Sequence, residues 1–221
     1  MKELNLYQIR DMAMGSGRAV FSIQQLANLT GKPKAVARVY ASRLVKRGLA
    51  TRVLRGRLSF TDDDFVVATQ LVEPSYVSLQ SALLFHGLTT QVPACVECIS
   101  PKNSRRYMAL GIAYHKMPPS LMFGYEAHAR SGSYAFVADP EKALLDMAYL
   151  FPRAPLPADL LGKVDRARLG RYVQRFQGRG EKRLGMLLVP SGGANADFDT
   201  DAVTDANLIL RRQAGGSRRD R

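Results

Sequence analysis

Residues 31–58 read GKPKAVARVYASRLVKRGLATRVLRGRL, and this stretch decides the fold of the N-terminal region. Gly31 suits the C-terminal end of one helix, and Pro33 suits the first turn of the next, where its missing N–H leaves no hydrogen bond unmade. Apolar residues recur at helical spacing after Pro33 and predict one buried side, formed by Val36, Val39, Tyr40 and Leu44. Two short extended runs follow, and Arg55-Gly56 between them predicts a tight hairpin.

Two more helices are predicted before this stretch. Apolar residues at helical spacing indicate the first, from Leu4 to about Met14. Ser22 and Gln25 have the spacing of a capping box, which predicts that a second helix starts at Ser22. Three helices followed by a hairpin are in the order of a winged helix-turn-helix. We therefore expect residues 1–72 to form a winged helix-turn-helix DNA-binding domain.

The charge of this region points to a polyanion. Residues 31–58 hold nine Lys and Arg residues and no Asp or Glu, and the whole chain has a formal net charge of +13. Each phosphate contact releases bound counterions, so such a segment favours nucleic acid. The side of the third helix away from the apolar stripe is predicted to carry small residues that allow close approach to a groove, Ala35, Ala37, Ala41 and Ser42. The predicted DNA contacts are Lys32, Lys34, Ala35, Arg38, Ser42, Arg43, Arg52, Arg55 and Arg57.

Residues 73–190 are expected to form a compact mixed α/β domain, which makes the fold class α+β. One helix is predicted between Ser78 and Gly87, another after Asp139, and a basic amphipathic one at Arg166–Phe176. Extended runs predict strands around Val92–Ser100, Tyr107–Lys116, Leu121–Glu126 and Tyr134–Val137. A basic loop between the first two strands offers accessory nucleic-acid contacts at Lys102, Arg105 and Arg106. Residues 191–221, small and polar at first, are expected to be a partly disordered tail.

Neither a metal site nor a cofactor is predicted. Cys95 and Cys98 form a C-x-x-C pair, but a structural zinc site needs about four ligands and no second pair exists. A redox centre would require the pair to open a helix, whereas the segment looks extended, so two structural thiols are favoured. Glu141 and Asp146 could form a carboxylate pair for a metal, although the start of a helix explains Glu141 without one. His86 is interpreted as a structural histidine at a helix C-terminus.

Two motifs carry a resemblance to a known family. They are YVSLQSALLFHGL at residues 76–88 and VADPEKALLD at residues 137–146. Together with the preceding winged helix, they resemble the AbiEi family, the antitoxins of abortive-infection toxin–antitoxin systems, over about residues 5–190. The resemblance implies a repressor that autoregulates its operon through the winged helix. It also implies a second domain that is needed to neutralise a cognate nucleotidyltransferase toxin, with basic residues that can aid DNA binding.

The expected partner is double-stranded DNA, an operator with an inverted repeat, and helix-turn-helix domains commonly bind such sites as homodimers. A stand-alone regulator without a toxin would show the same motifs. A metal-dependent nuclease and a winged helix that binds protein are further alternatives, and a solvated basic face is the simplest reading of the charge. RNA is less expected, because no aromatic side chains are interleaved with the cations. The chain has no run of about 20 apolar residues and no secretion signal, so we expect a cytoplasmic protein without a membrane partner.

Overall fold

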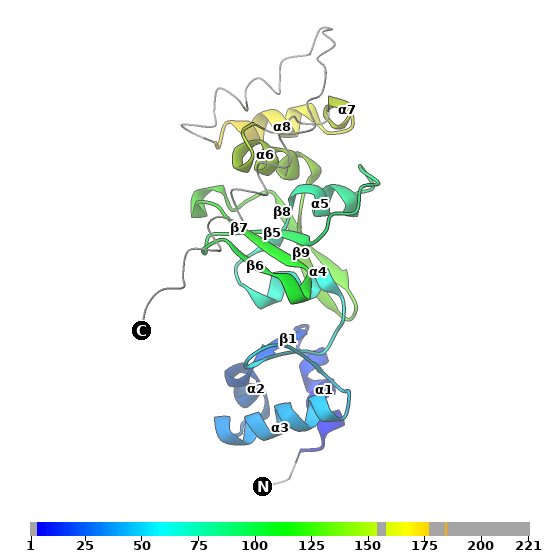
Figure 1. The fold of residues 1–221 in the computed structure, drawn as a ribbon, viewed down its shortest axis with the longest axis vertical. Coiled ribbons are helices and arrows are strands. Elements are labelled where there is room, and N and C mark those ends of the chain that lie inside the picture. The colour runs from blue at the N-terminus through cyan, green and yellow to red at the C-terminus, as the bar shows by residue number, and fades with distance from the viewer. Residues whose placement is uncertain (1–3, 154–157, 177–183, 185–221) are drawn as a thin grey trace, which may run out of the picture. The chain divides into compact units, whose positions relative to one another are not determined.

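The computed structural model describes residues 4–153, 158–176 and 184. The fold is mixed α+β with two β-sheets in this part of the chain (Figure 1), which confirms the α+β part of the predicted fold class. The chain divides into two compact units between Ala143 and Leu144. The boundary expected at residues 72/73 falls within the first unit and stays a prediction. The boundary expected at residues 190/191 and the tail that follows it lie outside the described residues.

The N-terminal region contains three helices and three short strands. In chain order the elements are α1 (Leu6–Gly15), β1 (Val20–Ser22), α2 (Ile23–Thr30), α3 (Lys34–Lys46), β2 (Thr51–Leu54) and β3 (Arg57–Ser59). Side-chain caps explain where two of the helices begin. Asn5 caps α1 and Ser22 caps α2, each in a reciprocal capping box with the glutamine three residues later. The capping box predicted at Ser22 is therefore confirmed.

Three residues, Gly31, Lys32 and Pro33, form the turn between α2 and α3. Gly31 has a φ of +62°, in the left-handed region that favours glycine, and it ends α2 as predicted. Pro33 is the N-cap of α3 rather than a residue of its first turn, so the predicted start was one position early. The Pro33 carbonyl still accepts the first hydrogen bond of the helix, from the backbone N–H of Ala37 at 3.0 Å.

The first sheet is antiparallel, with strand order β1-β3-β2. Its β2–β3 hairpin turns at Arg55-Gly56 as predicted, and Gly56 has a φ of +74° that few other residues adopt. The backbone N–H of Ile23 donates to the Gly56 carbonyl at 3.1 Å, which joins the hairpin turn to the start of α2. Strand β1 was not predicted, because its three residues gain their partner only from β3, much later in the chain.

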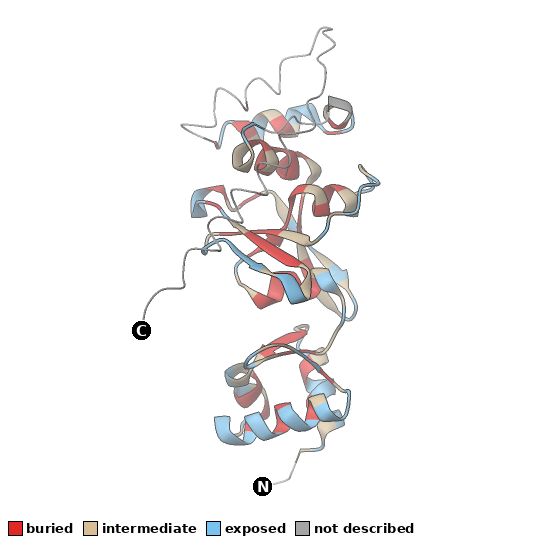
Figure 2. Ribbon diagram, viewed as in Figure 1, coloured by how far each residue is buried: buried red, intermediate tan, exposed pale blue. Residues whose placement is uncertain are grey.

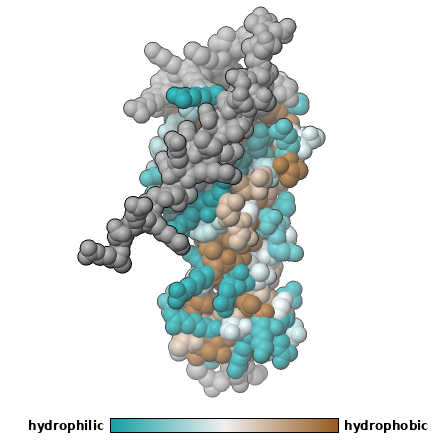
Figure 3. Space-filling model, in the orientation of Figure 1, coloured by the Kyte–Doolittle hydropathy of each residue, from teal (hydrophilic) through white to brown (hydrophobic). Residues whose placement is uncertain are grey.

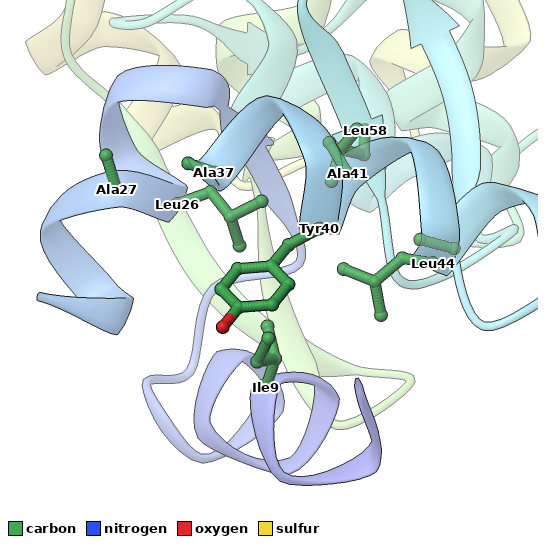
Figure 4. Close-up of a cluster of buried hydrophobic side chains, with 9 residues drawn as sticks. Ile9, Leu26, Ala27, Ala37, Tyr40, Ala41, Leu44 and Leu58 are labelled. Atoms are coloured by element: carbon green, nitrogen blue, oxygen red, sulfur yellow. The ribbon is translucent and has the colours of Figure 1, made fainter. Parts of the chain in front are cut away.

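One apolar core joins α1, α2, α3 and the hairpin. Figure 4 shows side chains from α3 that project toward residues of α1 and α2, with the Tyr40 ring beside Ile9. The buried members of this core are Ile9, Leu26, Ala27, Ala37, Tyr40, Ala41, Leu44, Ala50 and Leu58. Because every helix of the region contributes to the same core, its burial fixes the position of α3 against α1 and α2.

The prediction for the buried side of α3 was wrong at two positions. Val36 and Val39 keep 37% and 47% of their surface exposed, whereas Ala37 and Ala41 are buried. Small side chains one turn apart let a helix backbone lie close to its neighbours, and the large Tyr40 ring fills the space between them. The expectation that Ala37 and Ala41 face outward was therefore wrong, while Ala35 and Ser42 are exposed as predicted.

A mixed six-stranded sheet follows, with strand order β6-β7-β5-β4-β9-β8. The strands are β4 (Tyr76–Val77), β5 (Val96–Ser100), β6 (Arg105–Tyr107), β7 (Ile112–Lys116), β8 (Tyr125–Arg130) and β9 (Ser133–Ala138). The helices of this region are α4 (Asp64–Leu71), α5 (Leu79–Phe85) and the 3-10 turns η1 (Met108–Leu110) and η2 (Pro119–Leu121). Helix α5, with Gly87 after it, confirms one prediction. The strand expected at Leu121–Glu126 is instead the end of η2, a short connection and the start of β8.

Gln70 of α4 links the two sheets. Its side-chain oxygen accepts hydrogen bonds from the backbone N–H groups of Ala19 and Val20, at 2.8 and 3.1 Å. Its side-chain nitrogen donates to the Ser133 hydroxyl and to the Tyr134 carbonyl, at 2.9 and 3.0 Å. Gln70 is almost completely buried, so one amide satisfies backbone groups of both the first and the second sheet.

Helix α6 (Pro140–Leu150) spans the boundary between the two units, and the second unit adds α7 (Ala158–Leu161) and α8 (Arg166–Val173). Asp165 caps α8, whose apolar side buries Leu169 and Val173 as predicted. Within residues 4–153, 158–176 and 184, no helix is long and apolar enough to cross a bilayer.

Candidate nucleic-acid interface

The outward side of α3 carries most of the predicted DNA contacts. Figure 2 shows this helix exposed along one side and buried along the other. The structure brings together five predicted residues on the exposed side, namely Lys34, Ala35, Arg38, Ser42 and Arg43. Lys32 is half-buried in the turn before the helix. The exposed side is therefore cationic, with small residues between the long basic ones.

The β2–β3 hairpin holds the other predicted contacts. Arg52 is exposed on β2, next to a bulge between Arg52 and Leu54. Arg55 is exposed in the turn itself, and Arg57 is half-buried on β3 opposite Leu54. The hairpin thus presents Arg55 to solvent at its turn.

Within the part of the chain that the structure describes, the cations of α3 and the hairpin form no ion pair with a carboxylate. Arg18 with Glu73 and Arg130 with Asp63 are ion pairs that arginines outside α3 and the hairpin form. Arg130 Nε donates to Asp63 Oδ2 at 2.9 Å, and Arg18 also donates to the Val20 carbonyl at 2.8 Å. These two arginines stabilise the fold, whereas the positive charge of α3 and the hairpin remains available to an external anion.

A cavity of about 600 Å³ opens beside the C-terminal half of α3. It is lined by three cations, Arg43, Lys46 and Arg47, together with Leu4, Asn5, Leu6 and Tyr40. None of its described lining residues is acidic. Asn5 is the N-cap of α1, and the N-terminal end of a helix favours negative charge. The cavity therefore suits a phosphate, and it adds Lys46 and Arg47 to the residues that the sequence had singled out as contacts.

Two of the three predicted accessory nucleic-acid contacts lie on a strand and not in a loop. Arg105 and Arg106 belong to strand β6 at the edge of the second sheet, so the predicted basic loop was wrong for these two residues. Arg105 packs over the Tyr107 ring, 5.7 Å from its centroid, and donates to the Tyr107 hydroxyl at 3.2 Å. Lys102 is exposed in the connection between β5 and β6. An edge strand with exposed arginines still presents positive charge to solvent.

The segments 76–88 and 137–146, singled out in the sequence, meet in the structure. Strands β4 and β9 run parallel, with Val77 opposite Val137. His86 Nε2 lies 2.9 Å from the carbonyl oxygen of Ala138, so the histidine has a structural partner at the end of α5. Buried Lys142 faces the ring of Tyr76, with Nζ 5.5 Å from the centroid. Residues of both segments up to Lys142 therefore pack together within the first unit.

Glu97 and His115 form a half-buried polar pair on the neighbouring strands β5 and β7. His115 Nε2 lies 3.9 Å from Glu97 Oε1, too far for a hydrogen bond. Burial raises the pKa of Glu97 to about 7, against the hydrogen bond from the Gln80 backbone and the charge of Arg106. Burial and then the Arg106 charge lower the pKa of His115 to about 4. His115 is therefore neutral at neutral pH, and the pair is no salt bridge.

Cys98 and the acidic residues of α6 are buried, whereas Cys95 is half-buried. Cys98 is completely buried on β5 and Cys95 is half-buried just before it, and burial raises the pKa of both thiols. A raised pKa keeps both thiols protonated, and they are inert because the thiolate is the reactive form. Glu141 and Asp146 are buried on α6, and within the described residues no three acidic, histidine or cysteine side chains gather as a metal site.

The assembled surface combines an exposed, cationic helix side that carries small residues with a hairpin whose turn is cationic. The signal that sequence reasoning missed is the pair of alanines one turn apart, Ala37 and Ala41, which marks the packed side of α3 and leaves Val39 outward. No protein-family model matches the chain, and a search of curated proteins returned no match.

Proposed function

We propose that residues 1–72 are a winged helix-turn-helix that binds double-stranded DNA, with α3 in the major groove and the β2–β3 hairpin as the wing. The observation that carries this proposal is the exposed side of α3, where Lys34, Arg38 and Arg43 have no carboxylate partner among the described residues. A three-residue turn with Gly31 joins α2 to α3, as helix-turn-helix motifs require. The element order and the three-stranded sheet support the same assignment.

Each part of the surface would then have its own task. Major-groove base edges are within reach of arginine and serine side chains on an exposed helix, and Arg38 suits the O6 and N7 atoms of guanine. Phosphates suit Arg55 at the wing tip and the cavity formed with Arg43, Lys46 and Arg47. Sequence specificity is therefore assigned to α3, and most of the affinity to the flanking cations.

The experiment that tests this proposal is a binding titration of the full chain on the duplex upstream of its own gene. A scrambled duplex of the same length is the comparison, and both are measured at two salt concentrations. We expect tight binding to the first duplex, weaker binding to the second, and a loss of affinity for both as salt rises. Equal, weak binding to both duplexes would leave a basic protein without a specific operator.

Arg38→Ala separates base recognition from general attraction. Arg38 is exposed, so its removal leaves the core of the region unchanged. If Arg38 contacts a base, specific binding weakens by about 1–3 kcal/mol while binding to the scrambled duplex changes much less. Arg153→Ala removes an exposed arginine outside this region and serves as the matched control. An unchanged affinity of the Arg38 variant for the operator would contradict the assignment of α3.

We further propose that the chain represses its own operon and acts as antitoxin to a nucleotidyltransferase-type toxin. This step rests on the resemblance of residues 76–88 and 137–146 to the AbiEi family. The contact between these segments, through Val77 opposite Val137 and His86 beside Ala138, agrees with their acting as one unit. Co-expression with a neighbouring nucleotidyltransferase gene tests it. Relief of growth arrest by the full chain supports an antitoxin, and continued arrest leaves a stand-alone regulator.

A further inference from the structure

Val39 occupies the centre of the exposed side of α3. Successive residues of an α-helix are rotated by about 100°, so the direction opposite the buried residues Ala37, Tyr40, Ala41 and Leu44 is fixed. Ala35, Val39, Ser42 and Lys46 point in that direction, with Arg38 and Arg43 beside them. Val39 is therefore the only large apolar side chain at the middle of this side of α3, and 47% of its surface is exposed.

The surroundings of Val39 make it protrude. Ala35 lies one turn before it and Ser42 almost one turn after it, and both side chains are short. Arg38 and Arg43 flank it with long, flexible side chains that can move aside from it. Figure 3 shows the same mixture over the N-terminal elements, where hydrophilic surface surrounds smaller hydrophobic areas. The result is a small apolar point within a cationic surface.

The formation of α3 does not explain why position 39 holds valine, a β-branched apolar residue. Valine is a poorer helix former than alanine, and an exposed valine gains nothing from the core. The major groove of DNA offers one apolar group that a short side chain such as valine can reach. That group is the C5-methyl of thymine, which among the four base pairs marks A·T and T·A in the major groove.

We propose that Val39 contacts the C5-methyl group of a thymine in the DNA site, and so makes this protein selective for thymine at that position. The inference rests on the proposed binding of DNA by α3. Ala35 borders the same apolar point, and the neighbouring Arg38 is free to contact an adjacent guanine. The methyl group is the only atom group that distinguishes thymine from uracil, so the contact can be tested by removing that group alone.

The experiment begins with duplexes selected by the full chain from a randomised pool. Each thymine of a selected duplex is then replaced singly by deoxyuridine, and the affinity is measured at fixed salt. Burying one methyl group contributes on the order of 0.8 kcal/mol, so we expect a loss of about 3- to 10-fold at one or more thymines. The other thymines of the same duplex serve as internal comparisons, because deoxyuridine leaves the base pair and the phosphates unchanged.

Val39→Ala is the matching protein variant. Val39 is exposed, and alanine is the better helix former, so the fold is retained. The variant is expected to bind the deoxyuridine and thymine duplexes with equal affinity at the position where the unaltered chain distinguishes them. Val92→Ala makes the same chemical change at a residue that is 80% exposed and lies outside the N-terminal region. It should keep the discrimination of the unaltered chain.

The outcomes separate the two proposals. Failure to select any preferred duplex overturns sequence-specific DNA binding, and the thymine contact with it. Selective binding that is equal for thymine and deoxyuridine at every position overturns the thymine contact and leaves DNA binding intact. Discrimination that persists in Val39→Ala assigns the methyl group to another residue and also overturns the role of Val39.

Discussion

Arg55 shows how the position of a single side chain predicts its task. It lies exposed in the two-residue turn of the β2–β3 hairpin, where Gly56 supplies the left-handed conformation. A side chain at a hairpin tip reaches phosphates more readily than base edges. Whatever Arg55 contributes to binding should therefore be independent of base sequence.

Arg55→Ala is expected to weaken binding to every duplex by a similar factor. The slope of log affinity against log salt should become shallower by about one, as for the loss of one phosphate contact. Titrations on two unrelated duplexes over a range of salt measure both effects. Arg171→Ala, an exposed arginine on α8, is the matched control. A loss confined to one base position would mean that Arg55 contacts a base instead.

Glu97 places an ionisable group where ionisation is unfavourable. Burial raises its pKa in the folded protein to about 7, above the reference value of 4.5. A carboxyl group of this kind stabilises the fold while it is protonated, and stability is lost as pH rises from 4.5 through 7. His115 acts in the opposite direction, because its pKa of about 4 means that stability is lost as pH falls below 6.5.

Glu97→Gln removes the ionisable group. The variant should therefore gain more stability over the unaltered chain at pH 8 than at pH 5. The difference between the variant and the unaltered chain is expected to grow by about 1–3 kcal/mol between these two pH values. The contribution of His115 is common to both chains and cancels. Urea unfolding at each pH measures the free energy of unfolding, with Glu126→Gln on exposed β8 as control. A difference that does not change with pH would contradict the raised pKa.

Among the secondary-structure elements, β1 is a clear case of a strand that depends on distant residues. It has three residues, and it pairs with β3 along one edge. Gln70 of α4 accepts hydrogen bonds from the backbone N–H groups of Ala19 and Val20, and it donates to Ser133 of β9 and to the carbonyl of Tyr134. A strand this short is therefore held in place by a side chain from a later helix.

Gln70→Leu keeps the size of the side chain and removes its hydrogen bonds. Two buried backbone N–H groups would lose their acceptor, so the free energy of unfolding should fall by about 2–5 kcal/mol. Equilibrium unfolding in urea measures this change. Gln24→Leu, at an exposed position of α2, should change stability by no more than about 0.5 kcal/mol. Equal small effects of both substitutions would show that Gln70 does not hold β1.

For the molecule as a whole, the excess of positive charge is not confined to the N-terminal region. The formal net charge is +13, and β6 adds Arg105 and Arg106 at an exposed sheet edge. The double substitution Lys102→Ala and Arg105→Ala tests whether this edge also contacts DNA. Affinity for all sequences should fall together, and the salt slope should become shallower by about one to two. An unchanged slope would limit the DNA contacts to α3 and the hairpin.

Local chemistry made much of this protein predictable. Ser22 and Gln25 cap α2, Gly31 ends it, and Arg55-Gly56 forms the hairpin turn, because each of these features depends on backbone conformation within a few residues. The exposed cations of α3 were likewise found from the sequence, since charged side chains are almost never buried without a partner.

Tertiary packing decided the rest. Val36, Val39, Tyr40 and Leu44 fit a helical period as well as Ala37, Tyr40, Ala41 and Leu44 do, so periodicity alone could not say which set is buried. The choice depends on how closely α3 packs against α1 and α2, and close packing favours alanine. Strand β1 and the role of Gln70 likewise depend on residues far away in the chain. The sequence by itself determined the caps, the turns and the charge, because those are local, and only the folded chain determined that Val39 faces outward.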